Sequence, residues 1–288
     1  MIKDYFISLS DFTEFVHKLN NKSLGKNIVI NGINDFDLDQ SFDLAIFSIN
    51  DLEIDSENLS DYTKKIRKKI YSLSSGGWNL KILDLGIFYR GSQHSDSLFA
   101  ISEILKQLSI LKVKALIINH GTNLTFDFYY ALKQNNNLIN IVSVDNKLPD
   151  NSLIRKILDD DNCKLGEYSC VGFQKHINNI DEIDLFKNML FENYSLGKIK
   201  NKIANTEPVF RNSDLIDINI RSVKSGDINN SHEFTNGLSS YEFCNLSRFA
   251  GLSKNLDLIS FSSLYQSSAI SSLISEGIWY AIDGMNNV

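Results

Sequence analysis

The chain has 288 residues, 43% hydrophobic and 22% charged, which suffices for one large α/β domain or two small ones. Its net charge of −6 argues against general nucleic-acid binding, which depends on basic surfaces. The apolar runs fall short of the ~20 residues of a membrane span, the N-terminal residues lack the pattern of a secretory signal, and the 3 cysteines form no CxxC pair. We therefore expect a cytoplasmic protein with no membrane span and no nucleic-acid partner.

Hydrophobic runs alternate with amphipathic segments along the whole chain. In chain order they predict strands at 27–30 and 44–49, a helix at 62–73, a strand at 81–85, a helix at 97–111, strands at 115–118, 141–145 and 169–173, a helix at 182–191, a strand at 215–220, a helix at 240–250, a strand at 258–262 and a helix at 267–284. Several strands are continuous apolar runs, as expected for strands that are buried on both faces.

This alternation predicts the fold class. Strands separated by helices favour parallel pairing through right-handed crossovers, with helices on both faces of the sheet. The expected architecture is a three-layer α/β/α sandwich with a mainly parallel sheet of about eight strands. The chain contains no long polar linker, so we expect residues 1–288 to form a single domain.

The segments that follow the predicted strands are the places to look for a site, because ligands of such sheets bind beyond the carboxyl ends of the strands. Three of these segments, at 121–125, 145–149 and 219–221, are rich in polar residues. Each follows a hydrophobic run, so the three should meet at one edge of the sheet.

These segments resemble the metal motifs of the ureohydrolases, the family of arginase, agmatinase and formimidoylglutamase. The resemblance extends from about residue 43 to the C-terminus, is nearest to a formimidoylglutamase-like branch of Bacteroidetes, and is weakest over residues 1–40. Other features that carry it are the segments 66–73, 84–86, 123–125, 171–174, 207–208, 214–227, 237–239, 249–252 and 278–280. The resemblance implies an arginase-like fold.

Members of that family hold two manganese ions, which convert a bridging water into a hydroxide that attacks a guanidinium or formimino carbon. Their ligands are histidine and aspartate side chains, which suit Mn²⁺. Carried onto this sequence, the ligand positions fall on Thr122, on Asp145, Lys147 and Pro149, and on Asn219 and Arg221. A further family aspartate falls on Lys224, and a late glutamate falls near Ser262 and Ser263. Only Asp145 keeps its type.

The replacements predict a vestigial pocket without a metal cofactor or catalytic residues. Lysine and arginine are protonated and repel cations, and neither His120 nor Asp127 nearby restores a paired ligand pattern. We expect Asp145 to pair with Arg221 or Lys147, so that charge-assisted hydrogen bonds replace metal bridges. The vestigial pocket comprises Thr122, Asp145, Lys147, Asn219, Arg221 and Lys224.

The functional prediction is therefore a pseudoenzyme of a C–N hydrolase family, retained for protein binding or scaffolding, with a protein partner or further copies of itself. Two alternatives stay open. The first is an active metal-dependent hydrolase of a formimino or guanidino substrate that uses rebuilt ligands. The second is a small-anion-binding module in which Lys147 and Arg221 hold the anion.

Overall fold

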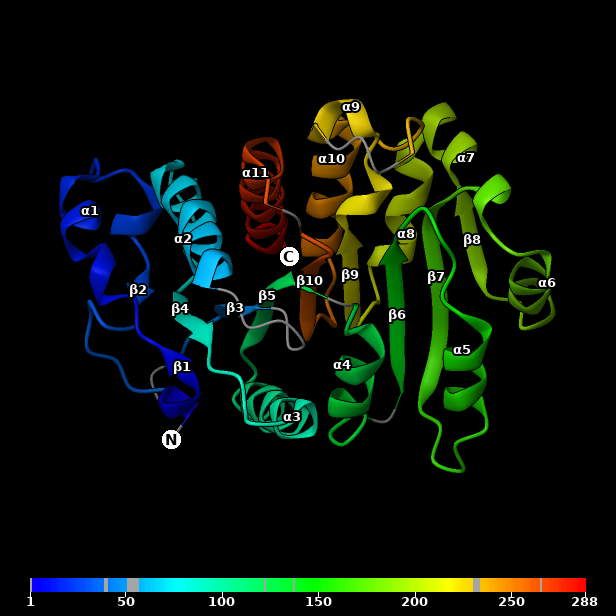
Figure 1. Ribbon diagram of the computed structural model, residues 1–288, viewed down its shortest axis with the longest axis horizontal. Helices are drawn as coiled ribbons and strands as arrows, with labels where there is room; N and C mark the ends of the chain where they lie inside the picture. The colour runs from blue at the N-terminus through cyan, green and yellow to red at the C-terminus, as the bar shows by residue number, and fades with distance from the viewer. Residues whose placement is uncertain are drawn as a thin grey trace.

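A ten-stranded sheet forms the middle layer of the computed structural model, which describes residues 2–38, 41–50, 57–121, 123–136, 138–229, 234–264 and 266–288 (Figure 1). The strands are β1 (Phe6–Ile7), β2 (Val29–Ile30), β3 (Leu44–Asn50), β4 (Ile82–Phe88), β5 (Lys114–His120), β6 (Ile139–Val144), β7 (Leu165–Phe173), β8 (Glu192–Ser195), β9 (Leu215–Asn219) and β10 (Leu258–Ser262). All eight predicted strands are present. The additional ones, β1 and β8, are short.

The strands lie in the order β1-β4-β3-β5-β10-β9-β6-β7-β8, and β2 also pairs with β4. The pairings are parallel apart from the antiparallel contact between β1 and β4. Parallel strands need long crossover connections, which the helices between them provide. The carboxyl ends of β5, β10, β9 and β6 therefore point toward the same edge of the sheet.

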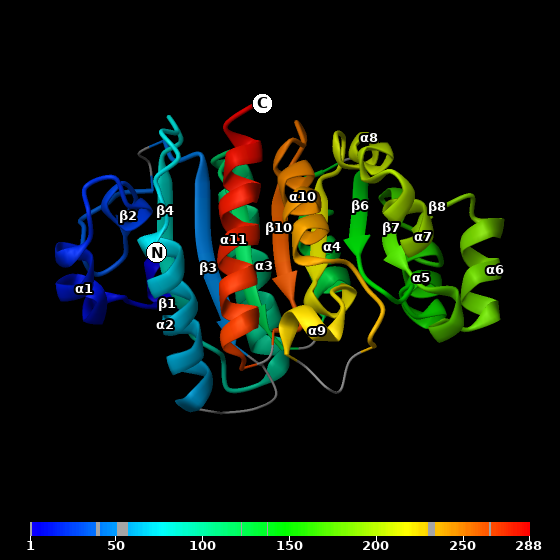
Figure 2. The ribbon, with the colours of Figure 1, turned by 90° about the horizontal axis from the view of Figure 1, so that it is seen from above.

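Helices cover both faces, so the predicted three-layer sandwich is confirmed (Figure 2). One face carries α2 (Glu57–Ser72), α7 (Leu196–Asn201), α8 (Glu207–Phe210), α10 (Ser240–Gly251) and α11 (Ser268–Met285), with α1 (Thr13–Lys18) and α9 (Ser225–Ile228) on the same side. The other face carries α3 (His94–Ile110), α4 (Thr125–Leu132), α5 (Asn151–Leu158) and α6 (Ile180–Asn188).

Side chains of each central strand alternate between two apolar clusters, one beneath each helical layer. In β3, Leu44 and Ile46 belong to the cluster beneath α2 and α11, whereas Ala45, Phe47 and Ile49 belong to the cluster beneath α3 and α4. All five are at most 1% exposed. The continuous hydrophobic runs of the sequence therefore arise because both faces of these strands are covered.

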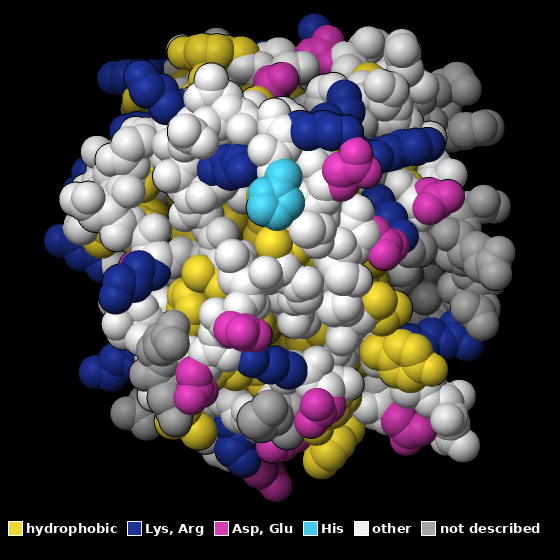
Figure 3. Space-filling view, turned by 90° about the vertical axis from the view of Figure 1, so that its left-hand side faces the viewer, with side chains coloured by type: hydrophobic (Ala, Val, Ile, Leu, Met, Phe, Trp, Pro, Cys, Tyr) yellow, Lys and Arg dark blue, Asp and Glu magenta, His cyan; other side chains and the backbone are white. Residues whose placement is uncertain are grey.

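The outer surface is mixed in character. Seen from the end of the sheet that carries α1 and β1, basic, acidic and apolar side chains are interspersed (Figure 3). Among the described residues, no helix combines the length and the apolar character that crossing a membrane would need.

Candidate functional site at the carboxyl ends of β6 and β9

The sheet register brings Asp145 and Asn219 together. β6 and β9 are adjacent parallel strands in which Val144 pairs with Ile218, so the next residue of each strand lies at the same level. The amide Nδ2 of Asn219 donates to Oδ2 of Asp145 at 3.0 Å. Both side chains are buried, with exposed fractions of 0% for Asn219 and 3% for Asp145.

Arg221 completes this contact. It lies in the turn that follows β9, and its Nη2 donates to the same carboxylate oxygen of Asp145 at 2.9 Å. The other oxygen, Oδ1, accepts from the backbone N–H groups of Asn146 at 2.7 Å and Lys147 at 3.3 Å. Burial raises the pKa of Asp145, while the Arg221 guanidinium and these N–H groups oppose the rise. The carboxylate form is the one that can accept from all four donors.

Two asparagine side chains hold the backbone of Arg221 in place. Oδ1 of Asn219 accepts from the Arg221 N–H at 3.0 Å and so caps the 3₁₀ turn at 220–222. Nδ2 of Asn146 donates to the Arg221 carbonyl at 2.8 Å. These two hydrogen bonds hold the N–H and the carbonyl of Arg221, and thereby help to position its guanidinium beside Asp145.

Gly172 allows β7 to run close beneath this site. Its φ is 104°, a left-handed conformation that favours glycine, and a Cβ there would lie 3.3 Å from the Asp145 carbonyl oxygen. The Asp145 N–H donates to the carbonyl of Val171 at 3.1 Å. The register between β7 and β8 shifts between Val171 and Phe173, as expected where a glycine bulges a strand.

Asp217, two residues before Asn219, is a second buried carboxyl group that the sequence did not single out. Its Oδ2 accepts from the hydroxyl of Ser262 at 2.9 Å and from Nδ2 of Asn123 at 3.4 Å. Burial, reinforced by the negative charge of Asp145, raises the pKa of Asp217 to about 7. An aspartate inside a hydrophobic strand was the available signal, but its partners come from β10 and from the segment after β5.

The side chains of two other predicted pocket residues, Lys147 and Lys224, do not contact Asp145. Lys147 is exposed and reaches Asp145 only through its backbone N–H. Nζ of Lys224 pairs with Asp227 at 3.1 Å instead. Thr122 lies outside the described residues. Of the two expected partners of Asp145, the structure therefore places the guanidinium of Arg221, and not the ammonium of Lys147, at the carboxylate.

A buried ion pair that was not predicted from the sequence joins α2 to β4. Arg67 of α2 donates to both carboxylate oxygens of Asp84 in β4, at 3.0 and 3.1 Å, and also to Oγ of Ser48 and the carbonyl of Gly86. The Tyr71 hydroxyl donates to Asp84 at 2.7 Å. Arg67 and Asp84 are at most 1% exposed, and each is surrounded by partners, so this network is a structural link between α2 and the sheet.

His120, the last residue of β5, is 2% exposed, and neither ring nitrogen has a hydrogen-bond partner among the described residues. Its ring packs edge-on against Tyr62, with centroids 5.4 Å apart. Burial, together with the positive charge of Arg67, lowers the pKa of His120 to about 3. His120 is therefore a neutral, buried imidazole at neutral pH.

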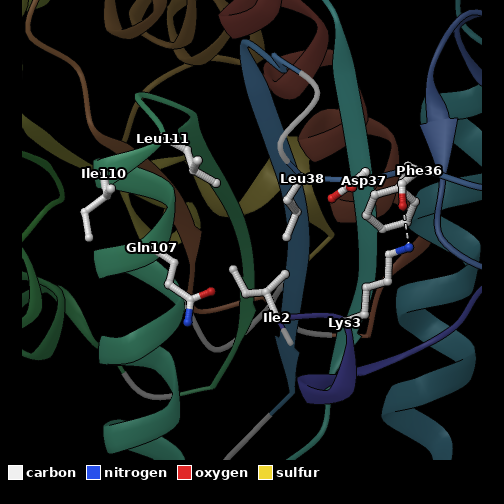
Figure 4. A pocket seen from close by; sticks show the side chains of 8 residues that line it. All are labelled: Ile2, Lys3, Phe36, Asp37, Leu38, Gln107, Ile110 and Leu111. Atoms are coloured by element: carbon white, nitrogen blue, oxygen red, sulfur yellow. Dashed lines mark hydrogen bonds between the residues drawn. The ribbon is translucent and has the colours of Figure 1, made fainter.

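A cavity of about 610 Å³ lies elsewhere (Figure 4). Gln107, Ile110 and Leu111 line it from the end of α3, a helix that begins beyond the carboxyl end of β4 and returns across the sheet. The cavity thus lies toward the amino ends of the strands, where ligands of such sheets do not usually bind. Lys3, on its rim, donates to the Phe36 carbonyl and lies over the Phe36 ring.

The same fold occurs in solved structures of C–N hydrolases. Formimidoylglutamase from Bacillus subtilis aligns with a TM-score of 0.74 at 13% identity, over 92% of each chain. Trypanosoma cruzi formiminoglutamase with Mn²⁺ aligns with a TM-score of 0.73 at 14% identity, over 86% of this chain and 95% of that one. For the proclavaminate amidino hydrolase of Streptomyces clavuligerus the TM-score is 0.63 at 15% identity, over 84% and 90%.

By sequence, no protein-family model matches the chain, and no curated protein does either. The structural matches show that this chain shares its fold with these proteins, among them an arginase superfamily protein from Trypanosoma cruzi. At 13–15% identity they establish the fold, and the chemistry has to be judged from the residues of this chain.

The described residues around Asp145 do not fit a pair of manganese ions. Among the parts of the chain that the structure describes, no three His, Cys, Asp or Glu side chains lie together as metal ligands would. One oxygen of Asp145 accepts from a guanidinium, and the other accepts from two backbone N–H groups. Manganese ions need several carboxylate or imidazole ligands. Here the carboxylate of Asp145 is already engaged by a guanidinium and by backbone N–H groups, so the described residues around it do not suit manganese.

Proposed function

We propose that this protein has kept the ureohydrolase fold without manganese-dependent hydrolysis, and that it acts by binding a protein partner or further copies of itself. The observation that carries the proposal is the ion pair between Asp145 and Arg221, at 2.9 Å. Kinship with the formimidoylglutamase-like branch of Bacteroidetes, a single domain over 1–288 and a cytoplasmic location are parts of the same proposal.

The ion pair supports this function through its charge. A dication and a guanidinium 4 Å apart repel by about 8 kcal/mol at an effective dielectric constant of ~20. Metal binding at Asp145 would have to overcome that repulsion or displace Arg221, whose backbone Asn146 and Asn219 hold. Arginine does not lose its proton in proteins, so no change of pH within the stable range removes the obstacle.

One end of the sheet supports the binding role. β8 is an edge strand, and α6 lies beside it (Figure 1). Ile180, Met189 and Leu190 at the two ends of α6 are 69%, 38% and 88% exposed. Leu190 also has a φ of 58°, a conformation that costs energy for a bulky side chain. Exposed apolar side chains beside an open sheet edge are typical of a contact surface.

The first test is metal content. Purified protein is incubated with excess Mn²⁺, desalted and analysed by plasma mass spectrometry, alongside hydrolysis assays with formiminoglutamate, arginine and agmatine. We expect far less than one manganese per chain and no release of formamide or urea. About two manganese per chain, with turnover of any of these substrates, would overturn the proposal and favour a hydrolase with rebuilt ligands.

A variant that restores carboxylates sharpens this test. The double substitution Asn219→Asp with Arg221→Asp returns two acidic ligands beside Asp145. We expect it to raise Mn²⁺ retention above that of the parent, whereas Lys187→Asp with Lys254→Asp, two exposed positions away from Asp145, should not. Equal retention in the two double variants would mean that these positions are not the remains of a metal site.

The binding role needs its own measurement. Light scattering after size exclusion gives the mass of the particle in solution, for the parent and for Leu190→Asp. A parent that is oligomeric, and a variant that dissociates, would place the contact at α6 and β8. Leu138→Asp is a matched control because Leu138 is also exposed, at 62%, but lies before β6. A parent that is monomeric and unaffected by either change would argue against self-association.

A further inference from the structure

A second cavity, of about 360 Å³, lies between α2 and α11. Its residues are separate from those around Asp145. α2 contributes Tyr62, Lys65, Lys68 and Lys69, and the segment that opens α11 contributes several serines, including Ser267 and Ser268. The two helices lie side by side on one face of the sheet (Figure 2). Cavities of this size accommodate small molecules.

The wall formed by α2 is positively charged without a matching acid. Lys65, Lys68 and Lys69 are spaced i, i+3 and i+4, which places them on one face of the helix. Among the residues that the structure describes, no carboxylate lines the cavity, and neither Lys65 nor Lys68 forms an ion pair. By contrast Lys64, one position before Lys65, pairs with Asp11 at 3.0 Å. Like charges on one helix face repel each other. In contrast to Lys64, neither Lys65 nor Lys68 has an acidic partner among the described residues that would offset this repulsion.

The opposite wall is formed by the N-terminal end of α11. Ser267 is the N-terminal cap residue of α11, but its side chain donates to the carbonyl of Ile228 at 3.3 Å and makes no capping hydrogen bond. The Ser267 side chain therefore leaves the first N–H groups of this 18-residue helix uncapped. Their partial positive charge lies at the cavity that the lysines also line. A chain with a net charge of −6 thus presents two adjacent surfaces that both favour an anion.

The two walls are fixed relative to each other. The Tyr62 hydroxyl donates to the Ser267 carbonyl at 3.0 Å, and Nζ of Lys69 donates to Oγ of Ser272 at 2.6 Å. Burial raises the pKa of Tyr62 to about 12, so its hydroxyl stays neutral and adds no negative charge to the cavity. A cavity that is already held open loses little conformational freedom when a ligand enters.

We propose that the cavity between α2 and α11 binds a phosphate group, either as inorganic phosphate or as the phosphate of a small ester. A phosphate carries two negative charges near neutral pH and presents several acceptor oxygens, which match the ammonium groups of Lys65 and Lys68. The volume exceeds what a lone tetrahedral anion needs, which leaves room for an organic group. This site is independent of the contact between Asp145 and Arg221.

The test compares two double variants by isothermal titration calorimetry at constant ionic strength. Inorganic phosphate and phenyl phosphate are titrated into the parent, into Lys65→Gln with Lys68→Gln, and into Lys187→Gln with Lys254→Gln. Both doubles remove two positive charges from exposed positions, but only the first pair lines the cavity. Circular dichroism melting curves check that both fold.

We expect the Kd for the preferred probe to rise at least tenfold in the cavity variant and to stay within twofold of the parent in the control. Tighter binding of phenyl phosphate identifies an ester as the ligand, and tighter binding of inorganic phosphate identifies the free anion. The proposal is overturned if the parent binds neither probe at 10 mM, or if the two double variants weaken binding equally, which would indicate only general charge attraction.

Discussion

Nη2 of Arg221 lies 2.9 Å from Oδ2 of Asp145, so a charge-assisted hydrogen bond ties the turn after β9 to the carboxyl end of β6. Asn219 donates to the same oxygen. One carboxylate therefore organises the polar groups at the middle of the sheet edge.

Replacing Asp145 with alanine should destabilise the fold. The change leaves the Arg221 guanidinium, the Asn219 amide and two backbone N–H groups without their acceptor, which costs about 3 kcal/mol. The free energy of unfolding from urea titration measures the loss. Glu14→Ala removes a carboxylate from an exposed ion pair and should change it by less than about 0.5 kcal/mol. Equal stability of the two variants would contradict the role given to Asp145.

Removing the Tyr71 hydroxyl should weaken the attachment of α2. Tyr71→Phe deletes one hydrogen bond to the buried Asp84 carboxylate and leaves the packing of the ring intact. Hydrogen bonds to charged groups contribute about 1.5–3 kcal/mol, so we expect a loss of about 2 kcal/mol in urea titration. Tyr241→Phe is the matched control, because Tyr241 is 73% exposed. A loss no larger than that of the control would mean that Asp84 is satisfied without Tyr71.

The pKa of Asp217 predicts a dependence of stability on pH. The folded-state pKa is about 7 and the ordinary value is 3.8, so the folded protein holds a proton that the unfolded chain releases in this range. The contribution is full below about pH 4 and is lost as the pH rises to about 7, by an amount on the order of 4 kcal/mol. Asp217→Asn, which cannot ionise, should remove this decline.

The measurement is the difference in unfolding free energy between Asp217→Asn and the parent, taken from pH 4 to pH 8. Taking the difference isolates Asp217 from groups that both proteins share. We expect the variant to gain on the parent steadily up to about pH 7 and then to keep a constant advantage. A difference that does not change with pH would show that Asp217 titrates at its ordinary pKa.

The lowered pKa of His120 predicts a loss of stability as the pH falls, the opposite of the effect of Asp217. Its folded-state pKa of about 3 lies below the ordinary 6.5, so its contribution is full above pH 6.5 and is lost as the pH falls toward 3. His120→Phe keeps an aromatic ring against Tyr62 and removes two ring nitrogens that have no partner among the described residues. The variant should gain about 2 kcal/mol relative to the parent between pH 8 and pH 5. A relative loss at pH 5 would indicate that the imidazole is protonated in the folded protein.

The sequence by itself determined the layers of the fold. The run at 115–118 indicated a strand buried on both faces, because a continuous apolar segment leaves no side for water. β1 and β8 could not be recognised in this way. Phe6–Ile7 is too short for a pattern, and Glu192–Ser195 is polar because it lies at the sheet edge. Hydrophobic periodicity reports burial, and edge strands are only partly buried.

The resemblance to ureohydrolase metal motifs also pointed to Asp145, Asn219 and Arg221, which follow or end predicted strands and so lie at the edge where ligands of such sheets bind. Only the tertiary structure decided which of them touch. It selected Arg221 over Lys147 as the partner of Asp145, gave Asp217 its partners Ser262 and Asn123, and joined Arg67 to Asp84. Such choices depend on strand order, register and side-chain direction between segments far apart in the chain, and local patterns of hydrophobicity carry no information about them.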